Sequence, residues 1–307
     1  MRSSTIMATA VVLASMLGCA DDVPPAADGS PASASTGPST GPSPSARTPE
    51  PQPSIEVPVV RRPPRTDGLV LGADVSWPQC PEGMGIPEKR SQGLPMPRPS
   101  ARFVVLGLTN GPGFTANPCL DDQVRWVRER GLMAAAYAVT SLPDDAVLEE
   151  HADDGPYDAD TRLGALSNAG YQQALFNVAT MQRAGLLSPV VWVDVEPVPV
   201  FAWSSEEEAN AAVVVGATQG YADAGYAVGT YSTPALWETV VGSLALALPE
   251  WRAAGLTSRA EALRRCRPDW SFQGGDAVLA QWVEGSRDHD VTCPGVGREL
   301  ARWFHQY

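Results

Sequence analysis

Two carboxylates stand two positions apart at the end of an apolar run in the middle of the chain. The run is Val190–Val195; it contains Asp194 and is followed by Glu196 and Pro197. Side chains two positions apart in an extended strand point the same way, about 7 Å apart along the backbone. Carboxylates so close cannot both ionise freely, so one keeps its proton to higher pH. An acid beside a carboxylate is the pair that cleavage of a glycosidic bond requires.

Two further acids lie near the ends of other apolar runs. Asp74 is at the end of Leu69–Val75, and Asp288 follows Ala277–Trp282. In barrels of parallel strands, functional side chains lie where strands end and the following loops begin. A single acid at such a position is more often a loop anchor, and a solvated turn is the alternative interpretation of Asp288–Asp290. Acids after three separate strands nevertheless favour one shared site.

Aromatic and polar side chains near these acids are expected to contact a substrate. Aromatic rings can stack on sugars, although most of the nine tryptophans must serve packing. The catalytic candidates are Glu196, Asp194, Asp74 and Asp288. The candidates for substrate contact are Trp77, Tyr231, Gln281, Trp282 and Asp290.

Seven short apolar runs alternate with helical patterns in the second part of the chain. Near-continuous apolar runs are typical of strands buried on both faces, as in a parallel sheet covered by helices. The predicted strands are Leu69–Val75, Phe103–Leu108, Leu132–Val139, Val190–Val195, Ala227–Tyr231, Glu250–Ala254 and Ala277–Trp282. The predicted helices are Asp121–Arg130, Asn168–Ala184 and Ser205–Ala224, and residues 141–167 are expected to form a long irregular loop.

This alternation predicts an α/β fold, a (β/α)8 TIM-like barrel that forms a single domain over residues 67–307. A doubly wound open sheet is the alternative, but no GxGxxG motif follows a predicted strand. The barrel would bring the acids at the strand ends to one face of the domain.

The charge of the chain argues against some classes of partner. Its 307 residues include 22 Lys and Arg against 35 Asp and Glu, a net charge of −13, and Lys89 is the only lysine. Nucleic acids and anionic lipid surfaces bind clusters of positive charge, so neither is expected as the main partner of this acidic chain. A hydrophobic fraction of 44% is ordinary for a globular protein. We expect a monomer that binds no cofactor.

Residues 1–19 are predicted to be an export signal. Arg2 precedes an apolar stretch, Ile6 to Leu17, that is too short to span a bilayer of roughly 30 Å. The ending Met16–Cys19 resembles a lipobox, which predicts that Cys19 carries a lipid anchor at the outer face of the membrane. Ordinary secretion is the alternative. Residues 20–66 hold 12 of the 29 prolines and no aromatic residue, which predicts a disordered linker.

Four cysteines follow Cys19, and an even number in an exported protein suggests two disulfides. Three pairings are possible. The pairs Cys80–Cys119 and Cys266–Cys293 are favoured because each closes a loop between consecutive elements of the predicted barrel. A zinc site is disfavoured because no CxxC or HxxxH spacing is present, so no metal is expected.

Taken in this order, the motifs resemble the glycoside hydrolase family 25 lysozymes, and still more the actinobacterial glycoside-hydrolase-like (DUF1906) domains. Asp74-Val75-Ser76 and Asp194-Val195-Glu196 match two strand ends of family 25. Gln281-Trp282 and the later Asp288-His289-Asp290 match its last motifs loosely. GADVSWPQC, NGPGFTANPCL and WVDVEP are similar to the second group, and the resemblance covers residues 68–307.

The resemblance implies a barrel that cleaves the β-1,4 bond between N-acetylmuramic acid and N-acetylglucosamine in peptidoglycan. It implies that Glu196 is the general acid and that Asp194 steadies a cationic intermediate. It also implies that Asp74, with Asp288 or Asp290, holds the sugar or a water molecule.

Two features depart from the family pattern. Trp282 replaces the usual Tyr, and His289-Asp290 replaces residues that commonly include Asn. The second group also contains many members with no established activity, and a shared fold does not prove catalysis. A non-catalytic module that binds peptidoglycan or another wall glycan is therefore a second hypothesis. A structural lipoprotein head whose acids are loop anchors is a third.

Overall fold

The structure, a computed structural model, describes residues 62–307 except Pro199. The predicted export signal with Cys19, and residues 20–61 of the predicted linker, lie outside the described residues. The backbone N–H of Thr66 donates a hydrogen bond of 2.9 Å to the carbonyl oxygen of Gly297. In the described part of the chain, no helix has the length and apolar character needed to span a membrane.

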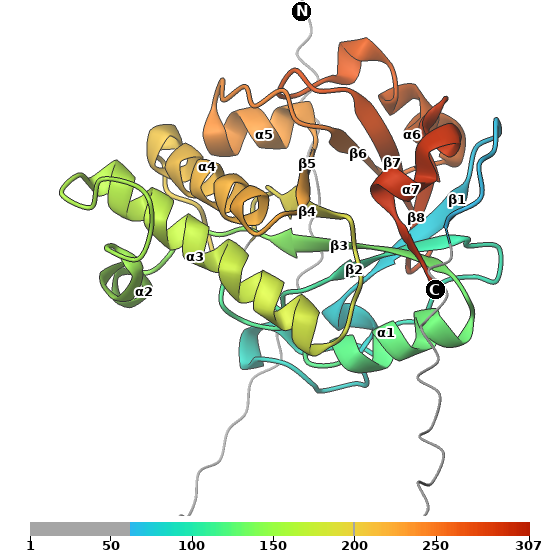
Figure 1. Ribbon diagram of the computed structural model, residues 1–307, viewed down its shortest axis with the longest axis horizontal. Coiled ribbons are helices and arrows are strands. Elements are labelled where there is room, and N and C mark those ends of the chain that lie inside the picture. Colours follow the sequence, from blue (N-terminus) through green and yellow to red (C-terminus); the bar gives the residue numbers. More distant parts are fainter. Residues whose placement is uncertain (1–61, 199) are drawn as a thin grey trace, which may run out of the picture. The chain divides into compact units, whose positions relative to one another are not determined.

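Eight strands close into a barrel, which confirms the predicted fold (Figure 1). Successive strands from β1 to β7 pair in parallel. Strand β8 pairs antiparallel with both β7 and β1 and so completes the ring. The strands are β1 Leu71–Val75, β2 Phe103–Gly107, β3 Met133–Val139, β4 Val190–Asp194, β5 Ala227–Ser232, β6 Glu250–Leu256, β7 Ala277–Glu284 and β8 Arg287–Thr292.

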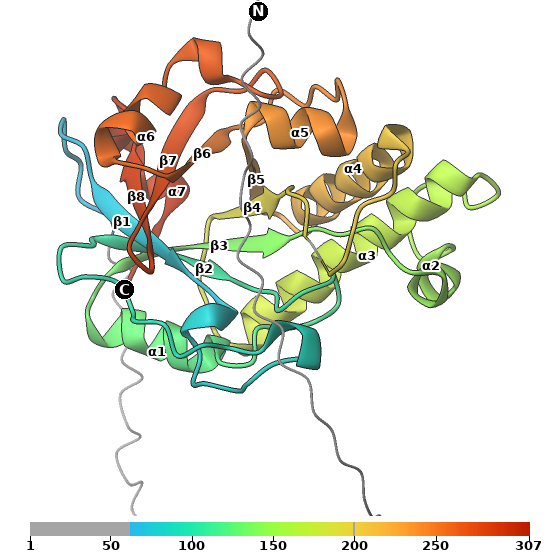
Figure 2. The same cartoon turned by 180° about the vertical axis from the view of Figure 1, so that it is seen from behind.

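Helices cover the outside of the strands, as the two opposite views show (Figures 1 and 2). Apolar residues of α1, α3, α4 and α5 pack against the outward side chains of β2, β3 and β4. The helices are α1 Leu120–Glu129, α2 Asp145–His151, α3 Arg162–Arg183, α4 Glu207–Asp223, α5 Pro234–Val241, α6 Arg259–Arg265 and α7 Leu300–Trp303.

The two faces of each strand carry different side chains, because successive residues of a strand alternate in direction. In β4, Val191 and Val193 pack outward on the helices, whereas Trp192 and Asp194 point into the barrel. Aromatic residues fill the end of the barrel where the parallel strands begin: Phe103, Trp192, Trp303 and Phe304. The short strand β9, His305–Gln306, pairs with the start of β3 at the same end. The polar inward residues therefore lie at the opposite end.

Asp288–Asp290, for which a solvated turn was the alternative interpretation, is part of strand β8. Its polar residues alternate along a strand whose outer face is only partly covered. One local prediction was wrong. Residues 141–167 are not one irregular loop, because they contain α2 and the first residues of α3. Asp144 and Thr161 cap these helices: their side chains accept hydrogen bonds from the N–H groups of Val147 and Gly164.

The two disulfides have the favoured pairing. Cys80–Cys119 joins the loop after β1 to the start of α1. Cys266–Cys293 joins the end of α6 to the residue that follows β8. Each bond therefore ties a connecting segment to a neighbouring element of the barrel.

Candidate active site

A cavity of about 450 Å³ opens at the end of the barrel where the parallel strands finish. Four acids line it: Asp74 on β1, Asp194 at the end of β4, Glu196 two residues later, and Asp288 on β8. The other predicted site residues in its lining are Trp77, Tyr231 and Gln281. The structure thus brings together carboxyl groups from three separate stretches of the chain.

Asp74 is held by a chain of hydrogen bonds across the barrel. The side-chain Nε2 of Gln281 donates to Asp74 Oδ2 at 2.9 Å, and the hydroxyl of Tyr231 donates to Gln281 Oε1 at 2.8 Å. Burial raises the pKa of Asp74 well above its ordinary value, the charges of Asp288 and Asp290 raise it further, and the Gln281 hydrogen bond lowers it. Asp74 therefore favours its protonated form.

Asp290 lies deeper in the barrel, next to Asp74. Its Oδ1 accepts a hydrogen bond of 2.8 Å from Nε1 of Trp251, while its Oδ2 is buried with no N–H donor among the described residues. Burial raises the pKa of Asp290 to about 8, although its hydrogen bonds with Asp74 and Trp251 act to lower it. A proton held between the two carboxyl groups gives each of them a partner, as in other close carboxyl pairs.

Asp194 and Glu196 differ in their surroundings. Asp194 is only 3% exposed, and its Oδ1 has no hydrogen-bond partner among the described residues. Burial raises the pKa of Asp194 well above its ordinary value, and the charge of Glu196 raises it further. Glu196 is partly exposed in the loop after β4; burial raises its pKa, the ammonium of Lys89 lowers it, and Asp288 raises it.

A buried, unpaired carboxyl is costly and is retained mainly where it is used. The pair is therefore expected to share protons as a coupled unit, with apparent pKa values that belong to both residues. Because Asp194 lies deep in the cavity and Glu196 lies at its edge, the two carboxyls can face different atoms of one ligand.

Sequence analysis missed several residues of the cavity, among them Tyr137 and Lys89. Tyr137 on β3 points inward, and its hydroxyl interacts with Ser76; burial raises the pKa of Tyr137 well above its ordinary value. Lys89 lies in the loop after β1. Tyr137 could have been found, because it is the one polar side chain at an inward position of the strand Met133–Val139. Lys89 lies outside every predicted strand, so no alternation of side chains indicated that it reaches the cavity.

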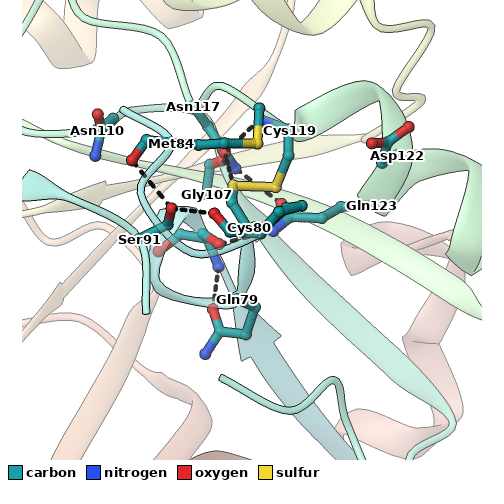
Figure 3. The surroundings of a disulfide bond; sticks show 12 residues. Gln79, Cys80, Met84, Ser91, Gly107, Asn110, Asn117, Cys119, Asp122 and Gln123 are labelled. Atoms are coloured by element: carbon teal, nitrogen blue, oxygen red, sulfur yellow. Dashed lines mark hydrogen bonds between the residues drawn. A yellow bond between two sulfur atoms is a disulfide. The ribbon is translucent and has the colours of Figure 1, made fainter. Parts of the chain in front are cut away.

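The loop that carries Trp77 is fixed to the barrel by polar contacts around the first disulfide (Figure 3). The Nε2 of Gln123 on α1 donates to the carbonyl oxygen of Ser76 at 2.7 Å, and Nδ2 of Asn117 donates to that of Gly107 at 2.8 Å. Trp77 begins a short 3-10 helix, Trp77–Gln79, so its ring is positioned in the cavity wall.

Two predicted substrate contacts do not lie in the cavity. Trp282 points outward from β7, where its ring stacks on His289 with centroids 5.1 Å apart and packs near Ala262 of α6. Its neighbour Gln281 points inward, as the alternation of a strand requires. Asp290 is fully buried beneath the cavity and acts on it through Asp74. Neither Trp282 nor Asp290 therefore has a surface that faces a ligand in this cavity.

Among residues 62–198 and 200–307, no group of three or more His, Cys, Asp and Glu side chains is arranged to hold a metal ion. The site consists of carboxyl, hydroxyl, amide and aromatic groups, with one ammonium. Such groups can transfer protons and bind hydroxyl-rich ligands.

No family model and no curated protein matches the sequence. Solved structures of similar chain path include a muramidase from Acremonium alcalophilum, with 16% identity, a TM-score of 0.48, and coverage of 76% of this chain and 99% of that chain. A bacterial lysozyme from Streptomyces coelicolor has 16% identity and a TM-score of 0.47, over 76% and 96% of the two chains. A family GH25 lysozyme from Aspergillus fumigatus has 17% identity and a TM-score of 0.45, over 76% and 99%. These are distant likenesses, so the chemistry of the cavity rests on its own residues.

Proposed function

We propose that the protein is a glycoside hydrolase that cleaves bacterial cell-wall glycan in the cavity at the strand ends. The observation that carries the proposal is that Asp194 and Glu196 line the same cavity, one deep and one at the edge. Hydrolysis of a glycosidic bond needs one carboxyl that delivers a proton and one carboxylate that supports positive charge at the sugar. This pair supplies both.

The positions of the two carboxyls favour different roles. Glu196, at the edge, donates its proton to the glycosidic oxygen as the bond from that oxygen to the anomeric carbon breaks. Asp194, deeper and without a hydrogen-bond partner among the described residues, stabilises the positive charge that develops on the sugar when the proton shared by the pair is on Glu196 and Asp194 is ionised. A water molecule then forms the new bond to the anomeric carbon, and the proton it loses returns to Glu196.

Asp74 and Asp288 complete the polar side of the cavity. Asp74 is fixed by Gln281, so its carboxyl can orient a sugar hydroxyl or the attacking water. The negative charge of Asp288 raises the pKa of Glu196 and so helps it to keep its proton. Neither group needs to exchange a proton with the glycosidic oxygen.

The choice of wall glycan follows from the sequence resemblance. The motifs Asp74-Val75-Ser76 and Asp194-Val195-Glu196, which match the peptidoglycan-cleaving family, both contribute acids to this cavity. We propose the muramic acid to glucosamine bond as the one cleaved. The predicted export signal supports a location outside the cell membrane, attached through Cys19 or secreted, where this substrate occurs.

The test is the release of reducing ends from insoluble peptidoglycan by the purified protein. Glu196→Gln and Asp194→Asn should each lower the rate by about 100-fold or more, the size of effect expected for loss of a general acid or of charge stabilisation. Glu150→Gln, at an exposed position of α2, should leave the rate unchanged. Retention on the polymer without any release would instead identify a binding module. If the protein is not retained on the polymer and releases no reducing ends, both hypotheses fail.

A further inference from the structure

Lys89 is the only lysine of the chain, and among residues 62–198 and 200–307 it is the only cation that lines the cavity. Four carboxyl groups line the same cavity. A long, flexible side chain that carries a positive charge is costly to hold partly buried, so its position calls for an explanation.

The backbone at Lys89 is held in place by one asparagine. Nδ2 of Asn110 donates to the carbonyl oxygen of Lys89 at 2.9 Å, and the N–H of Ile86 donates to Asn110 Oδ1 at 2.9 Å. Gly85, which precedes Ile86, adopts a φ of +94°, and a Cβ there would lie 2.4 Å from Asn110 Oδ1. The short 3-10 helix Pro87–Lys89 is therefore fixed against the barrel, with its last side chain directed to the cavity.

The ammonium of Lys89 lies over an aromatic ring and leaves its hydrogen-bonding capacity free. Its Nζ is 5.5 Å from the centroid of the Trp77 ring, a cation–π arrangement. Within residues 62–198 and 200–307 it makes no hydrogen bond and no ion pair within 4.0 Å. An ammonium has three N–H donors, so all three are available to a ligand that enters beside Trp77.

The charge of Lys89 also acts on the proposed acid. Burial raises the pKa of Glu196 and the ammonium of Lys89 lowers it, so the ammonium opposes the protonated form that a general acid needs. A negatively charged group bound to Lys89 would offset the ammonium and help Glu196 to keep its proton when the ligand is in place.

We propose that Lys89 is a specificity-determining residue that binds a carboxylate carried by the saccharide next to the scissile bond. This inference rests on the proposed function and deepens it, because it names the residue that recognises the acidic sugar. A single carboxylate matches the single ammonium, whereas a phosphate with up to two negative charges would face the four carboxyls without a second cation. The same contact links recognition of the acidic sugar to protonation of Glu196.

The experiment compares two soluble tetrasaccharides of alternating N-acetylglucosamine and N-acetylmuramic acid. One carries its lactyl carboxylates, and in the other these groups are reduced to alcohols. The values of kcat/KM are measured for the wild type, Lys89→Met, Lys89→Arg and Glu88→Gln, the last an exposed neighbour on the same short helix. Lys89→Met should lower kcat/KM about 10- to 100-fold for the acidic glycan and leave the reduced glycan within about 3-fold. Lys89→Arg should retain most of the preference.

The pH dependence of kcat/KM distinguishes this role from a purely structural one, because a structural role of Lys89 would leave that dependence unchanged. Because Lys89 lowers the pKa of Glu196, Lys89→Met should shift the alkaline limb of kcat/KM to higher pH, whereas Glu88→Gln should not. An equal loss on both glycans, or a loss in Lys89→Arg as large as in Lys89→Met, would overturn the inference.

Binding separates this inference from the proposed function. Titration of tryptophan fluorescence with each tetrasaccharide measures affinity without turnover. If neither glycan is cleaved but the acidic one binds more tightly in a Lys89-dependent way, the hydrolase proposal fails and the inference on Lys89 stands. If both glycans are cleaved and bound equally by wild type and Lys89→Met, the inference fails and the hydrolase proposal stands.

Discussion

The amide of Gln281 donates a hydrogen bond of 2.9 Å to the carboxyl of Asp74, although 207 positions separate the two residues. Strand β8 lies between their strands, so the bond crosses the interior of the barrel. It exists only because the barrel closes: β8 pairs with both β7 and β1. The site and the closure of the fold therefore depend on each other.

Replacing Gln281 should destabilise the protein. Gln281→Leu leaves the buried Asp74 carboxyl without its N–H donor and the Tyr231 hydroxyl without its acceptor, which should cost about 1–3 kcal/mol in free energy of unfolding. Urea denaturation at pH 7 measures the change. Gln219→Leu, at an exposed position of α4, is the matched control and should change stability by less than about 0.5 kcal/mol. Equal changes in the free energy of unfolding for the two variants would contradict a stabilising role of the buried hydrogen bond.

Asp290 should make the protein less stable as pH rises. Its pKa is raised from 3.8 to about 8, so between these values the folded state holds a proton that the unfolded state has lost. Stability from this group is therefore fully present below pH 3.8 and is lost as pH rises towards 8, with a slope of at most about 1.4 kcal/mol per pH unit.

Asp290→Asn should flatten this dependence, because an amide does not titrate. Denaturation curves from pH 4 to pH 8 measure the slope for wild type, for the variant, and for Asp276→Asn at an exposed position. A slope in Asp290→Asn that parallels the wild type would show that the group titrates normally in the folded state.

The sequence was sufficient to predict the barrel and most of its acidic residues. Asp74 and Asp194 end apolar runs, and in a parallel barrel the ends of such runs meet at one face. The same rule of alternation would have excluded Trp282: if Gln281 points inward, its neighbour must point outward. The structure places it there, against His289.

Strand β8 and the position of Lys89 could not be recognised from any local pattern in the sequence. Strand β8 consists largely of charged residues, because Asp288 and Asp290 point into the polar end of the barrel. Lys89 reaches the cavity through contacts with Asn110, a residue 21 positions away, and no periodicity reports such a contact. Long-range hydrogen bonds of this kind become visible only once the chain has folded.

The two tryptophans should respond differently to substitution. Trp77→Ala removes a ring from the cavity wall and should raise KM for glycan by about 10-fold, equivalent to about 1.4 kcal/mol of binding. Trp282→Phe weakens outward packing and should cost about 0.5–3 kcal/mol of stability while KM stays within about 2-fold. Steady-state kinetics and thermal unfolding of both variants measure these effects. A larger KM change in Trp282→Phe than in Trp77→Ala would be inconsistent with the geometry.

The two disulfides should contribute equally to stability but not to activity. Each closes a loop, of 39 and 27 residues in sequence separation, and its removal should cost about 2–4 kcal/mol. The pair of substitutions Cys80→Ala and Cys119→Ala should also lower hydrolysis, because this bond anchors the loop with Trp77 and Lys89. The pair Cys266→Ala and Cys293→Ala should leave hydrolysis near wild type at a temperature where both variants are folded. Reducing-end assays after a circular-dichroism check of folding measure this, and equal activity losses would refute it.

The role of Glu196 as the acid is tested most directly by a substrate whose leaving group needs no proton. We compare kcat/KM of wild type and Glu196→Gln on a wall tetrasaccharide and on a dinitrophenyl glycoside of the same sugars. If Glu196 is the acid, Glu196→Gln should lose about 100-fold or more on the tetrasaccharide and less than about 10-fold on the dinitrophenyl glycoside. Equal losses on both substrates, or no loss on either, would contradict it.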